Sequence, residues 1–156
     1  MTTPKIGNKA PDFTLAATGE QKIKLSSLRG APVVLYFYPK DATPGCTQEG
    51  LDFTASIAEF ERLKVTILGL SRDSVASHEK FKLKQGFAFD LLSDSEEKAC
   101  RLYDVIKEKN MYGKKVMGIE RSTFLIDASG ALVCEWRKVK VKDHVQEVLE
   151  AVKQLA

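Results

Sequence analysis

The feature that most constrains this chain is a run of seven apolar and aromatic-rich residues from Val33 to Pro39. A short continuous run of this kind is typical of a strand that is buried on both faces, because a half-exposed strand would alternate apolar with polar residues. The sequence therefore predicts that this segment is a central strand of a sheet.

A helix is predicted directly after this strand. Thr43 precedes Pro44, and a hydroxyl residue followed by proline is expected at the N-cap and first position of a helix. Cys46 then occupies the third helical position, where free backbone N–H groups and the positive end of the helix dipole favour an anion such as a thiolate. The alternative is that Cys46 is a small buried hydrophobe, since free cysteine is among the most buried residue types. The residues alone leave both interpretations open.

The helix is expected to reach about Arg62 and to lead into a second apolar strand, Val65 to Leu70. Two strands joined by a helix form a right-handed βαβ unit, so these strands should be parallel. Ligands and reactive groups collect beyond the C-terminal ends of such strands. The loop from Ser71 to Asp73 should therefore lie near Cys46.

Antiparallel hairpins are predicted at both ends of the chain. The first joins strand-like pieces at Phe13 to Leu15 and Ile23 to Leu25, and the second joins Ser122 to Asp127 with Ala131 to Lys138. An amphipathic helix from Lys142 to Leu155 follows. We therefore expect an α/β fold with a mixed central sheet flanked by helices and an N-terminal β-hairpin, in a single domain spanning residues 1–156.

Two further helices and a loop are expected between the second strand and the C-terminal hairpin. The first helix runs from Ser74 to Gln85, and within it His78 reads as a partly packed residue rather than as a general base. Asp94 and Glu97 have the spacing of a capping box and predict a helix, reaching about residue 105, that carries Cys100 near the edge of its buried stripe. Residues 107–115 read as a polar loop.

Composition and charge exclude several classes of protein. The net charge of +3 is too small to indicate nucleic-acid binding, and the lysines between residues 107 and 142 are interrupted by apolar and acidic residues. No apolar run approaches the roughly 20 residues of a membrane span, and the first residues lack the apolar core of a signal peptide. We therefore expect a cytoplasmic protein with no nucleic-acid or membrane partner.

The three cysteines form neither a disulfide framework nor a metal site. Their number is odd and none belongs to a C-x-x-C pair, and His78 and His144 lie far from each other and from the cysteines in sequence. Cys134 alternates with Leu132 and Trp136 on one face of its predicted strand, so it reads as a core residue. We expect no metal and no cofactor.

A family resemblance favours the reactive interpretation of Cys46. The pattern Pro39-x-x-x-Thr43-x-x-Cys46 resembles the active-site signature of peroxiredoxins, and the longer run from Phe37 to Thr47 is similar to that of the bacterioferritin-comigratory-protein (Q-type) subgroup. The resemblance implies a thioredoxin-like fold and a thiol-dependent peroxidase of antioxidant defence and redox homeostasis. Further similar segments follow in order along nearly the whole chain: Gly7-x-x-Ala10-Pro11-Asp12-Phe13, Leu28-Arg29-Gly30, Ser71-Arg72-Asp73-Ser74, Phe89 to Asp94 and Arg121 to Asp127.

The resemblance also implies roles for individual residues. Cys46 would attack a terminal oxygen of hydrogen peroxide or an organic hydroperoxide and become a sulfenic acid, the first and reversible product of thiol oxidation. Thr43 would offer its hydroxyl to the peroxide and the thiolate, Arg121 would stabilise the thiolate and the charge on the leaving oxygen, and Pro39 would shield the sulfur from water. Glu49, one turn after Cys46, would be a hydrogen-bonding partner. Without the resemblance, Arg121 reads as the partner of a salt bridge at the end of a strand.

The chain departs from the subgroup in its second cysteine. Many Q-type members carry a resolving cysteine five residues after the reactive one, and others carry it on the following helix, whereas these positions here hold Leu51 and Lys82. We therefore expect an external thiol to resolve the sulfenic acid, from glutathione with a glutaredoxin or from a thioredoxin, in a monomer or weak homodimer. The alternatives are a two-cysteine cycle through Cys100 and a non-catalytic chaperone or redox-sensing adaptor on the same scaffold.

Overall fold

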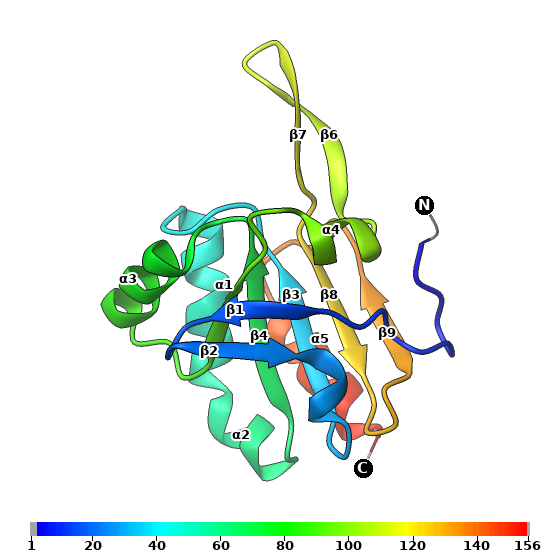
Figure 1. The fold of residues 1–156 in the computed structure, drawn as a ribbon. Helices are drawn as coiled ribbons and strands as arrows, with labels where there is room; N and C mark the ends of the chain where they lie inside the picture. The colour runs from blue at the N-terminus through cyan, green and yellow to red at the C-terminus, as the bar shows by residue number, and fades with distance from the viewer. Residues whose placement is uncertain (1–2, 156) are drawn as a thin grey trace.

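The computed structural model describes residues 3–155, which are organised around one twisted, seven-stranded sheet (Figure 1). The strand order is β2-β1-β5-β4-β3-β8-β9, with β3 paired parallel to β4 and antiparallel to β8. The mixed sheet and the N-terminal hairpin predicted from the sequence are therefore confirmed. The strands of this sheet are β1 (Thr14–Ala17), β2 (Gln21–Lys24), β3 (Val33–Phe37), β4 (Thr66–Ser71), β5 (Asp90–Ser93), β8 (Ser122–Ile126) and β9 (Leu132–Trp136).

Both faces of the sheet are buried, because alternate residues of β3 enter two different cores. Val33, Leu35 and Phe37 belong to one hydrophobic cluster, and Val34 and Tyr36 belong to the other. This is the period of two expected of a strand, and it explains why the run is apolar without interruption. The predicted central strand is confirmed.

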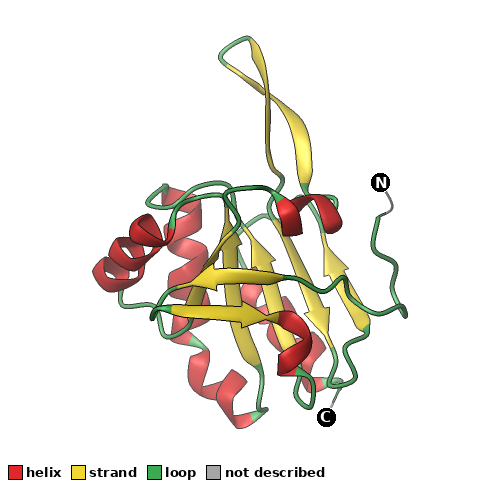
Figure 2. Cartoon of the chain, viewed as in Figure 1, coloured by secondary structure: helices red, strands yellow, loops and turns green. Residues whose placement is uncertain are grey.

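The helices divide between the two faces of the sheet (Figure 2). The face of Val34 and Tyr36 is covered by four helices, and the opposite face by a short helix and a 3₁₀ turn. Most of the apolar helical surface thus lies on one side of the sheet, together with Cys46. The four helices are α1 (Pro44–Ala55), α2 (Ile57–Arg62), α3 (Val75–Gln85) and α5 (His144–Lys153), and the other two elements are α4 (Lys98–Leu102) and η1 (Leu25–Leu28).

The prediction of one continuous helix from Pro44 to Arg62 is wrong in one respect. The helix is broken at Ser56 into α1 and α2. Ser56 leaves the helical region with φ −101° and ψ 8°, and its amide donates to the carbonyl of Phe53. Its own carbonyl then accepts the amides of Glu59 and Phe60, which begins α2. Serine interrupts a helix more readily than an apolar residue does, because its side chain can hydrogen-bond to nearby backbone groups in non-helical conformations.

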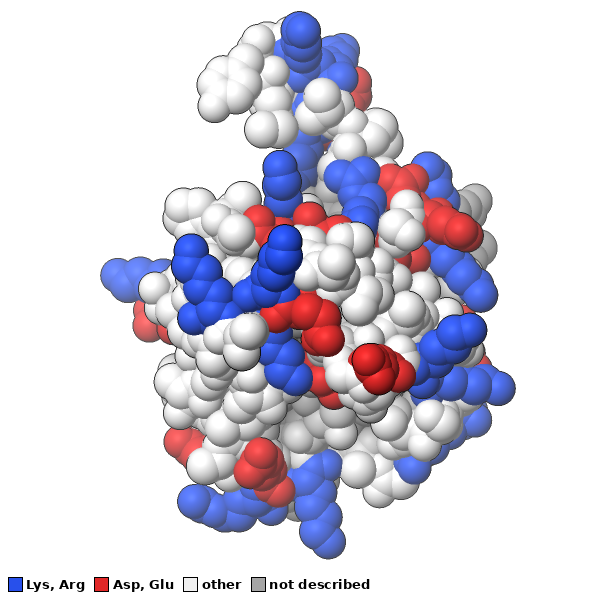
Figure 3. Space-filling view, turned by 60° about the vertical axis from the view of Figure 1, so that its left-hand side comes forward, with Lys and Arg blue, Asp and Glu red and all other residues white. Residues whose placement is uncertain are grey.

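The prediction of a polar loop at residues 107–115 is also wrong. The chain forms an antiparallel hairpin of β6 (Ile106–Met111) and β7 (Lys114–Ile119), which projects from the body of the molecule (Figure 1). Tyr112 and Gly113 connect the strands with φ of 54° and 80°, the pair of positive values that a tight two-residue hairpin turn requires. Lysine side chains cover much of the projecting hairpin (Figure 3).

The capping box expected at Asp94 and Glu97 differs from the observed helix start. Asp94 does cap, but its carboxylate accepts the amides of Lys98 and Cys100 at 2.8 and 2.7 Å. Glu97 is the N-cap residue, with a left-handed backbone, and its side chain pairs with arginines instead. α4 therefore starts later and ends sooner than predicted. Within residues 3–155, none of the helices combines the length and the hydropathy that crossing a membrane would need.

Candidate active site

Cys46 lies in the first turn of α1, just beyond the C-terminal end of β3. Thr43 is the N-cap residue, with φ −89° and ψ 154°, and Pro44 is the first helical residue, so Cys46 is the third, as predicted. The cysteine is 2% exposed and belongs to the core on the α1 side of the sheet. The thiol is buried, as expected of a small hydrophobe, and it also lies at the positive end of a helix, as expected of a reactive thiol.

A buried arginine lies beside the sulfur. Arg121 Nη2 is 3.5 Å from Cys46 Sγ, and its Nη1 donates to Glu49 Oε1 at 2.7 Å. The sheet explains this arrangement, because β8 runs antiparallel to β3 with Ser122 opposite Phe37. The residue before Ser122 must therefore lie beside the end of β3, where α1 begins. The structure thus brings Arg121 next to Glu49 and Cys46, which lie 72 and 75 positions away from it in sequence.

Gly45 leaves room for this arginine. A side-chain carbon at position 45 would lie 3.0 Å from Arg121 Nη2, which is too close unless the guanidinium moves. A glycine directly before Cys46 therefore permits the close approach of the cation to the helix start.

Glu49 is fully buried, and only one of its carboxylate oxygens has a partner. Oε1 accepts from Arg121, whereas Oε2 has no hydrogen-bond partner among the described residues. Burial raises the pKa of Glu49 to about 7, against the opposing attraction of the Arg121 guanidinium. This acid therefore changes charge near neutral pH, which makes it both an anchor for the arginine and a titratable neighbour of Cys46.

Thr43 occupies the N-cap position but does not cap the helix with its side chain. Its hydroxyl donates to the carbonyl of Lys40 at 2.7 Å. The hydroxyl oxygen therefore keeps its lone pairs free to accept a hydrogen bond, and the first-turn amides of α1 keep their free donors. Pro39, half-buried, lies two residues beyond the end of β3 and borders a surface hollow with Lys40, Arg72 and Asp73.

A further cation, Lys109, lies near this site, and the sequence pattern did not indicate it. Burial, and then the charge of Arg121, lowers the pKa of Lys109, while the Cys46 thiolate opposes the shift. The Lys109 ammonium donates to the carbonyl of Ile119, and Arg72 Nη1 lies 3.4 Å from the carbonyl of Met117. The base of the β6–β7 hairpin thus brings one basic group, Lys109, toward Arg121 and Cys46. Lys109 was not expected at the site because the lysine-rich segment around it was interpreted as a solvated loop.

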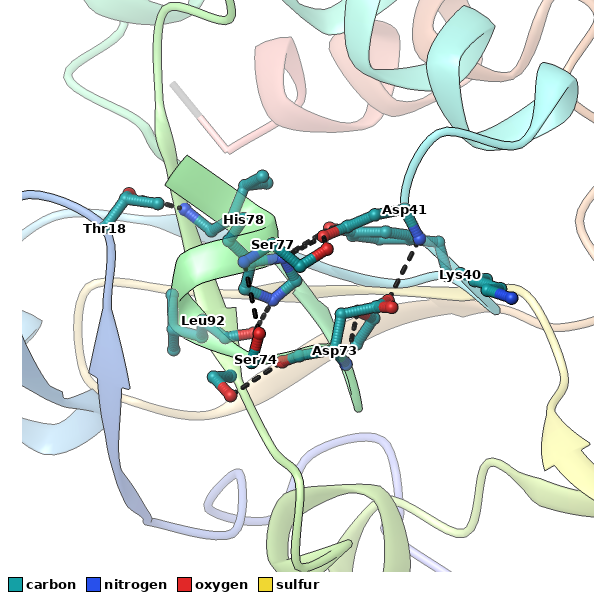
Figure 4. Close-up of polar contacts among 12 residues, drawn as sticks. Thr18, Lys40, Asp41, Asp73, Ser74, Ser77, His78 and Leu92 are labelled. Atoms are coloured by element: carbon teal, nitrogen blue, oxygen red, sulfur yellow. Dashed lines mark hydrogen bonds and ion pairs between the residues drawn. The ribbon is translucent and has the colours of Figure 1, made fainter. Parts of the chain in front are cut away.

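The loop from Ser71 to Asp73 lies beside the strand-to-helix loop, as the topology predicted, but its contact is with Asp41 rather than with the sulfur. Asp73 Oδ2 accepts the backbone N–H of Asp41 at 2.9 Å. His78 was expected to be partly packed, and this is wrong. It is fully buried, with Nδ1 2.7 Å from Asp41 Oδ2 and Nε2 2.8 Å from the carbonyl of Leu92 (Figure 4).

The other two cysteines lie in different surroundings. Cys100 is 0% exposed, which corrects the sequence-based expectation that it lies at the edge of a buried stripe. It packs in the core on the α4 side of the sheet, whereas Cys46 packs in the other core. Cys134 is half-buried and packs against the Cys46-side core, so its assignment as a core residue holds in part. Three metal-binding side chains (His, Cys, Asp or Glu) do not come together anywhere in residues 3–155.

Comparisons with known proteins identify the family. The sequence profile of the AhpC/TSA family matches residues 6–134. Peroxiredoxin Bcp of Xanthomonas campestris pv. campestris is 57% identical over 142 residues, which cover 91% of this chain and 89% of the relative. Peroxiredoxin Bcp of Bacillus subtilis is 52% identical over 154 residues, 99% of this chain and 98% of the relative.

Solved structures agree with this assignment. The bacterioferritin comigratory protein of Xanthomonas campestris, studied for alkyl peroxide reduction through trapped intermediate and ligand complexes, superposes with a TM-score of 0.91 at 52% identity and covers 97% of this chain and 99% of its own. A cysteine-to-serine mutant of PrxQ from Xylella fastidiosa gives 0.93 at 46% identity and covers 99% of both chains. The thioredoxin-like fold implied by the resemblance is thus confirmed. The chain belongs to the AhpC/TSA family, among its peroxiredoxins, which are thiol-dependent peroxidases.

Proposed function

We propose that Cys46 is the residue that reduces the hydroperoxide in this thiol-dependent peroxidase. The observation that carries the proposal is the approach of Arg121 Nη2 to 3.5 Å from Cys46 Sγ, with Glu49 holding the other arm of the guanidinium. A cation fixed beside the first turn of a helix favours the thiolate, which is the nucleophilic form of cysteine. Cys100 also lies at a helix start, but the carboxylate of Asp94 lies beside it.

The reaction follows from this geometry. The Cys46 thiolate attacks one peroxide oxygen, the S–O bond forms, and the O–O bond breaks with its electron pair leaving on the second oxygen. That oxygen takes up a proton and departs as water or an alcohol, and Cys46 becomes a sulfenic acid. Arg121 stabilises the negative charge as it moves from sulfur to the leaving oxygen.

Thr43 and Pro39 complete the site. Because the Thr43 hydroxyl hydrogen is directed to the Lys40 carbonyl, its oxygen is free to accept the O–H of a bound hydroperoxide and so to orient it. Pro39 lies in the loop between β3 and α1 and limits the access of water to the sulfur. Glu49 keeps Arg121 in place, and we assign it to positioning rather than to contact with the peroxide.

We also propose that an external thiol completes the cycle, supplied by glutathione with a glutaredoxin or by a thioredoxin. Leu51 and Lys82 occupy the positions where the subgroup places its second cysteine. The two cysteines replaced in separate structures of the Xanthomonas campestris relative are 36 residues apart, and the residue 36 positions after Cys46 is Lys82. Cys100 is a poor substitute, because the sheet lies between the two cores.

The same site supports a simple assembly. Cys46, Glu49 and Arg121 all come from one chain, so the chemistry requires no residue from a second copy. We therefore propose a monomer or weak homodimer, acting in the cytoplasm as a single domain.

Intact-mass measurement after one equivalent of hydrogen peroxide, with a sulfenic-acid trap and without reductant, tests the proposal. We expect the trap adduct on Cys46, and no adduct in Cys46→Ser. Loss of two hydrogens that disappears in Cys100→Ser would instead establish a two-cysteine cycle. Peroxide consumption by Cys46→Ser at the wild-type rate would remove Cys46 from the chemistry.

A further inference from the structure

The β6–β7 hairpin projects from the edge of the sheet at which Cys46 lies. β3 and β4 are parallel and both end at this edge (Figure 1). Ile119, the last residue of β7, precedes Arg121 by two positions, and Arg121 Nη2 lies 3.5 Å from Cys46 Sγ. At a rise of about 3.3 Å per residue, the end of β6 at Met111 lies roughly 17 Å beyond Ile106. The base of the hairpin is therefore close to the active site, and its tip extends far beyond the site.

The base of the hairpin is held by the loop after β4. Arg72 Nη1, from this loop, donates to the carbonyl of Met117 at 3.4 Å and to Glu97 Oε2 at 2.8 Å. The Glu120 amide donates to the Val105 carbonyl at 2.7 Å, one residue beyond each strand. Above this base, the six residues of β6 pair with the six of β7. The hairpin is therefore ordered before any partner binds, which lowers the entropy that is lost on binding.

The register divides the hairpin into two faces. Lys109 lies opposite Val116, and Met111 lies opposite Lys114. Residues that lie opposite each other across an antiparallel pair share a face, as do residues two positions apart in one strand. One face therefore consists of Lys109, Met111, Lys114 and Val116, and we call it the inner face. The residues that alternate with these in sequence form the outer face.

The inner face is the one that turns toward the active site. A side-chain carbon at Gly118 would lie 3.4 Å from Lys109 Cδ and 3.8 Å from Arg72 Nη2, so the lysine stem and the arginine both lie over this glycine. Burial, and then the charge of Arg121, lowers the pKa of Lys109, and the Cys46 thiolate opposes this shift. Lys109 is therefore within electrostatic range of both groups, and the rest of the inner face extends outward from it.

The hairpin combines exposed apolar side chains with positive charge. Residues 106–119 contain four lysines and one glutamate, and the lysines cover much of the hairpin (Figure 3). Of the eight large apolar side chains that are exposed in residues 3–155, four lie in the hairpin, namely Met111, Tyr112, Val116 and Met117. Exposed apolar groups gathered in this way mark a site of interaction, and the surplus of lysines favours a partner of negative charge.

We propose that the inner face is the docking surface for a dithiol protein reductant whose surface around its reactive thiol is negatively charged and partly apolar. The inference rests on the proposed function, since it takes oxidised Cys46 as the group that this partner reduces. The size of the hairpin favours a protein over a small thiol. A tripeptide such as glutathione spans at most about 11 Å, so at Cys46 it would meet the base of the hairpin and not Met111 or Lys114. A protein can contact the tip and reach Cys46 together.

Docking serves the reduction of the sulfenic acid. One thiol of the bound reductant attacks the sulfur of oxidised Cys46, the S–S bond forms, the S–O bond breaks, and the hydroxyl leaves as water with the proton of that thiol. The second thiol of the reductant then attacks the reductant's own sulfur in this mixed disulfide. The Cys46 thiol is released as the disulfide of the reductant forms, so the sulfenic acid gains the two electrons that the dithiol loses.

The test measures the two half-reactions of the peroxidase separately. Each protein is oxidised with one equivalent of hydrogen peroxide and is then mixed with an excess of a reduced thiol. The thiols are glutathione and two proteins that are negatively charged at neutral pH, a thioredoxin and a dithiol glutaredoxin, each used alone. Rapid quenching with an alkylating agent and intact mass give the rate constants for formation and for loss of the sulfenic acid. The variant carries Met111→Ser and Lys114→Gln, both on the inner face.

Met117→Ser combined with Lys115→Gln is the matched control. It makes the same two substitutions on the outer face, and Met117 and Met111 are 56% and 51% exposed. The bond from Arg72 is kept, because it goes to the backbone carbonyl of Met117. The two variants therefore have the same composition and charge and differ only in the face that is changed.

We expect the inner-face variant to react about tenfold more slowly with at least one of the two protein reductants, because two contacts of the interface are lost. The outer-face variant should keep the wild-type rate. Glutathione and hydrogen peroxide should react at wild-type rates with both variants, which also shows that both are folded. Raised ionic strength should slow the wild type with that protein reductant more than it slows the inner-face variant, because the variant lacks one lysine.

Equal rate constants for the inner-face and outer-face variants would overturn the proposal, as would reduction of the wild type by glutathione and by neither protein. A wild-type dimer in sedimentation that the inner-face variant lacks, with unchanged reduction rates, would assign the face to a second copy of the chain instead. Binding to phosphatidylglycerol vesicles that is lost in this variant, again with unchanged reduction rates, would assign it to a membrane surface. Failure of the proposed function is seen separately, as a wild-type protein in which peroxide does not oxidise Cys46 at all.

Discussion

Cys46 and Cys100 occupy the same position in two different helices and have opposite surroundings. Each is the third residue of its helix, α1 beginning at Pro44 and α4 at Lys98, and each is almost fully buried, at 2% and 0% exposure. By helix position and burial alone, the two thiols could not be told apart.

The charge beside each thiol distinguishes them. Cys46 faces the guanidinium of Arg121, whereas the amide of Cys100 donates to the carboxylate of Asp94 at 2.7 Å. The positive end of α4 is therefore already occupied by an acid, while that of α1 is not capped by the side chain of Thr43. Burial, followed by the charge of Asp94, raises the pKa of Cys100 far above its usual range. We therefore infer that the start of α1 favours a reactive thiol, whereas the acid beside Cys100 opposes one.

The largest expected effect is loss of activity on removing the cysteine beside the cation. Cys46→Ser should abolish peroxide consumption, whereas Cys100→Ser and Cys134→Ser should keep most of it, because Cys100 lies beside the carboxylate of Asp94 and Cys134 lies in a strand. Steady-state peroxide consumption with an excess of external thiol measures this. Loss of activity in Cys100→Ser with a normal circular dichroism spectrum would show that the two surroundings do not differ in the way that we describe.

The second prediction concerns removal of the cation beside Cys46. Arg121→Met should slow oxidation of Cys46 by about 10²–10³-fold, which is the typical loss when one fixed donor to a developing charge is removed. It should also slow the alkylation of Cys46 by iodoacetamide at fixed pH, since a nearby cation favours the thiolate. Arg72→Met is the control, because that arginine lies in the adjoining loop and pairs with Glu97 rather than with the sulfur. An unchanged alkylation rate in Arg121→Met would remove Arg121 from the site.

The sequence predicted the position of Cys46 in the first turn of its helix but not the details of its surroundings. The apolar run at Val33 and the proline at Pro44 are local signals, and the strand and the start of the helix formed as expected. The burial of Cys100 was missed because it depends on Asp94 and on packing across the sheet, which a helical stripe does not reveal. The ion pair of Asp41 and His78 joins residues 37 positions apart, and no periodic pattern reports such a contact.

The β6–β7 hairpin is the clearest failure of pattern reasoning. Its strands carry lysines on both faces and no apolar face, so the alternation that signals a strand is absent. The one available signal was Tyr112-Gly113, a two-residue connection with glycine second, which suits a tight hairpin turn. Because Lys109 was then assigned to a solvated loop, the basic group that the hairpin brings toward Arg121 was missed as well.

The third prediction concerns the acid on the Cys46 side. The pKa of Glu49 is raised from 4.5 to about 7 by burial, so the native state keeps its proton where the unfolded chain has lost it. The resulting stability is complete below about pH 4.5 and is lost as the pH rises to about 7, by on the order of 3 kcal/mol. Urea unfolding from pH 4.5 to 7.5 should show this decline in wild type and not in Glu49→Gln. Parallel curves for the two proteins would mean that Glu49 is ionised throughout.

The smallest expected effect separates the two helix starts through Thr43. In α4 the carboxylate of Asp94 caps the first turn, and its loss would cost stability, whereas the hydroxyl of Thr43 donates to the Lys40 carbonyl and leaves the amides of α1 free. Thr43→Val should therefore lower the free energy of unfolding by less than the ~1 kcal/mol typical of a lost cap. It should slow the reaction of Cys46 with peroxide about tenfold, because the hydroxyl that orients the peroxide is gone. Thr43→Ser keeps the hydroxyl and should restore the rate, measured by stopped-flow oxidation under single-turnover conditions. A full loss of cap energy in Thr43→Val with an unchanged rate would make Thr43 a structural cap and would remove this difference between α1 and α4.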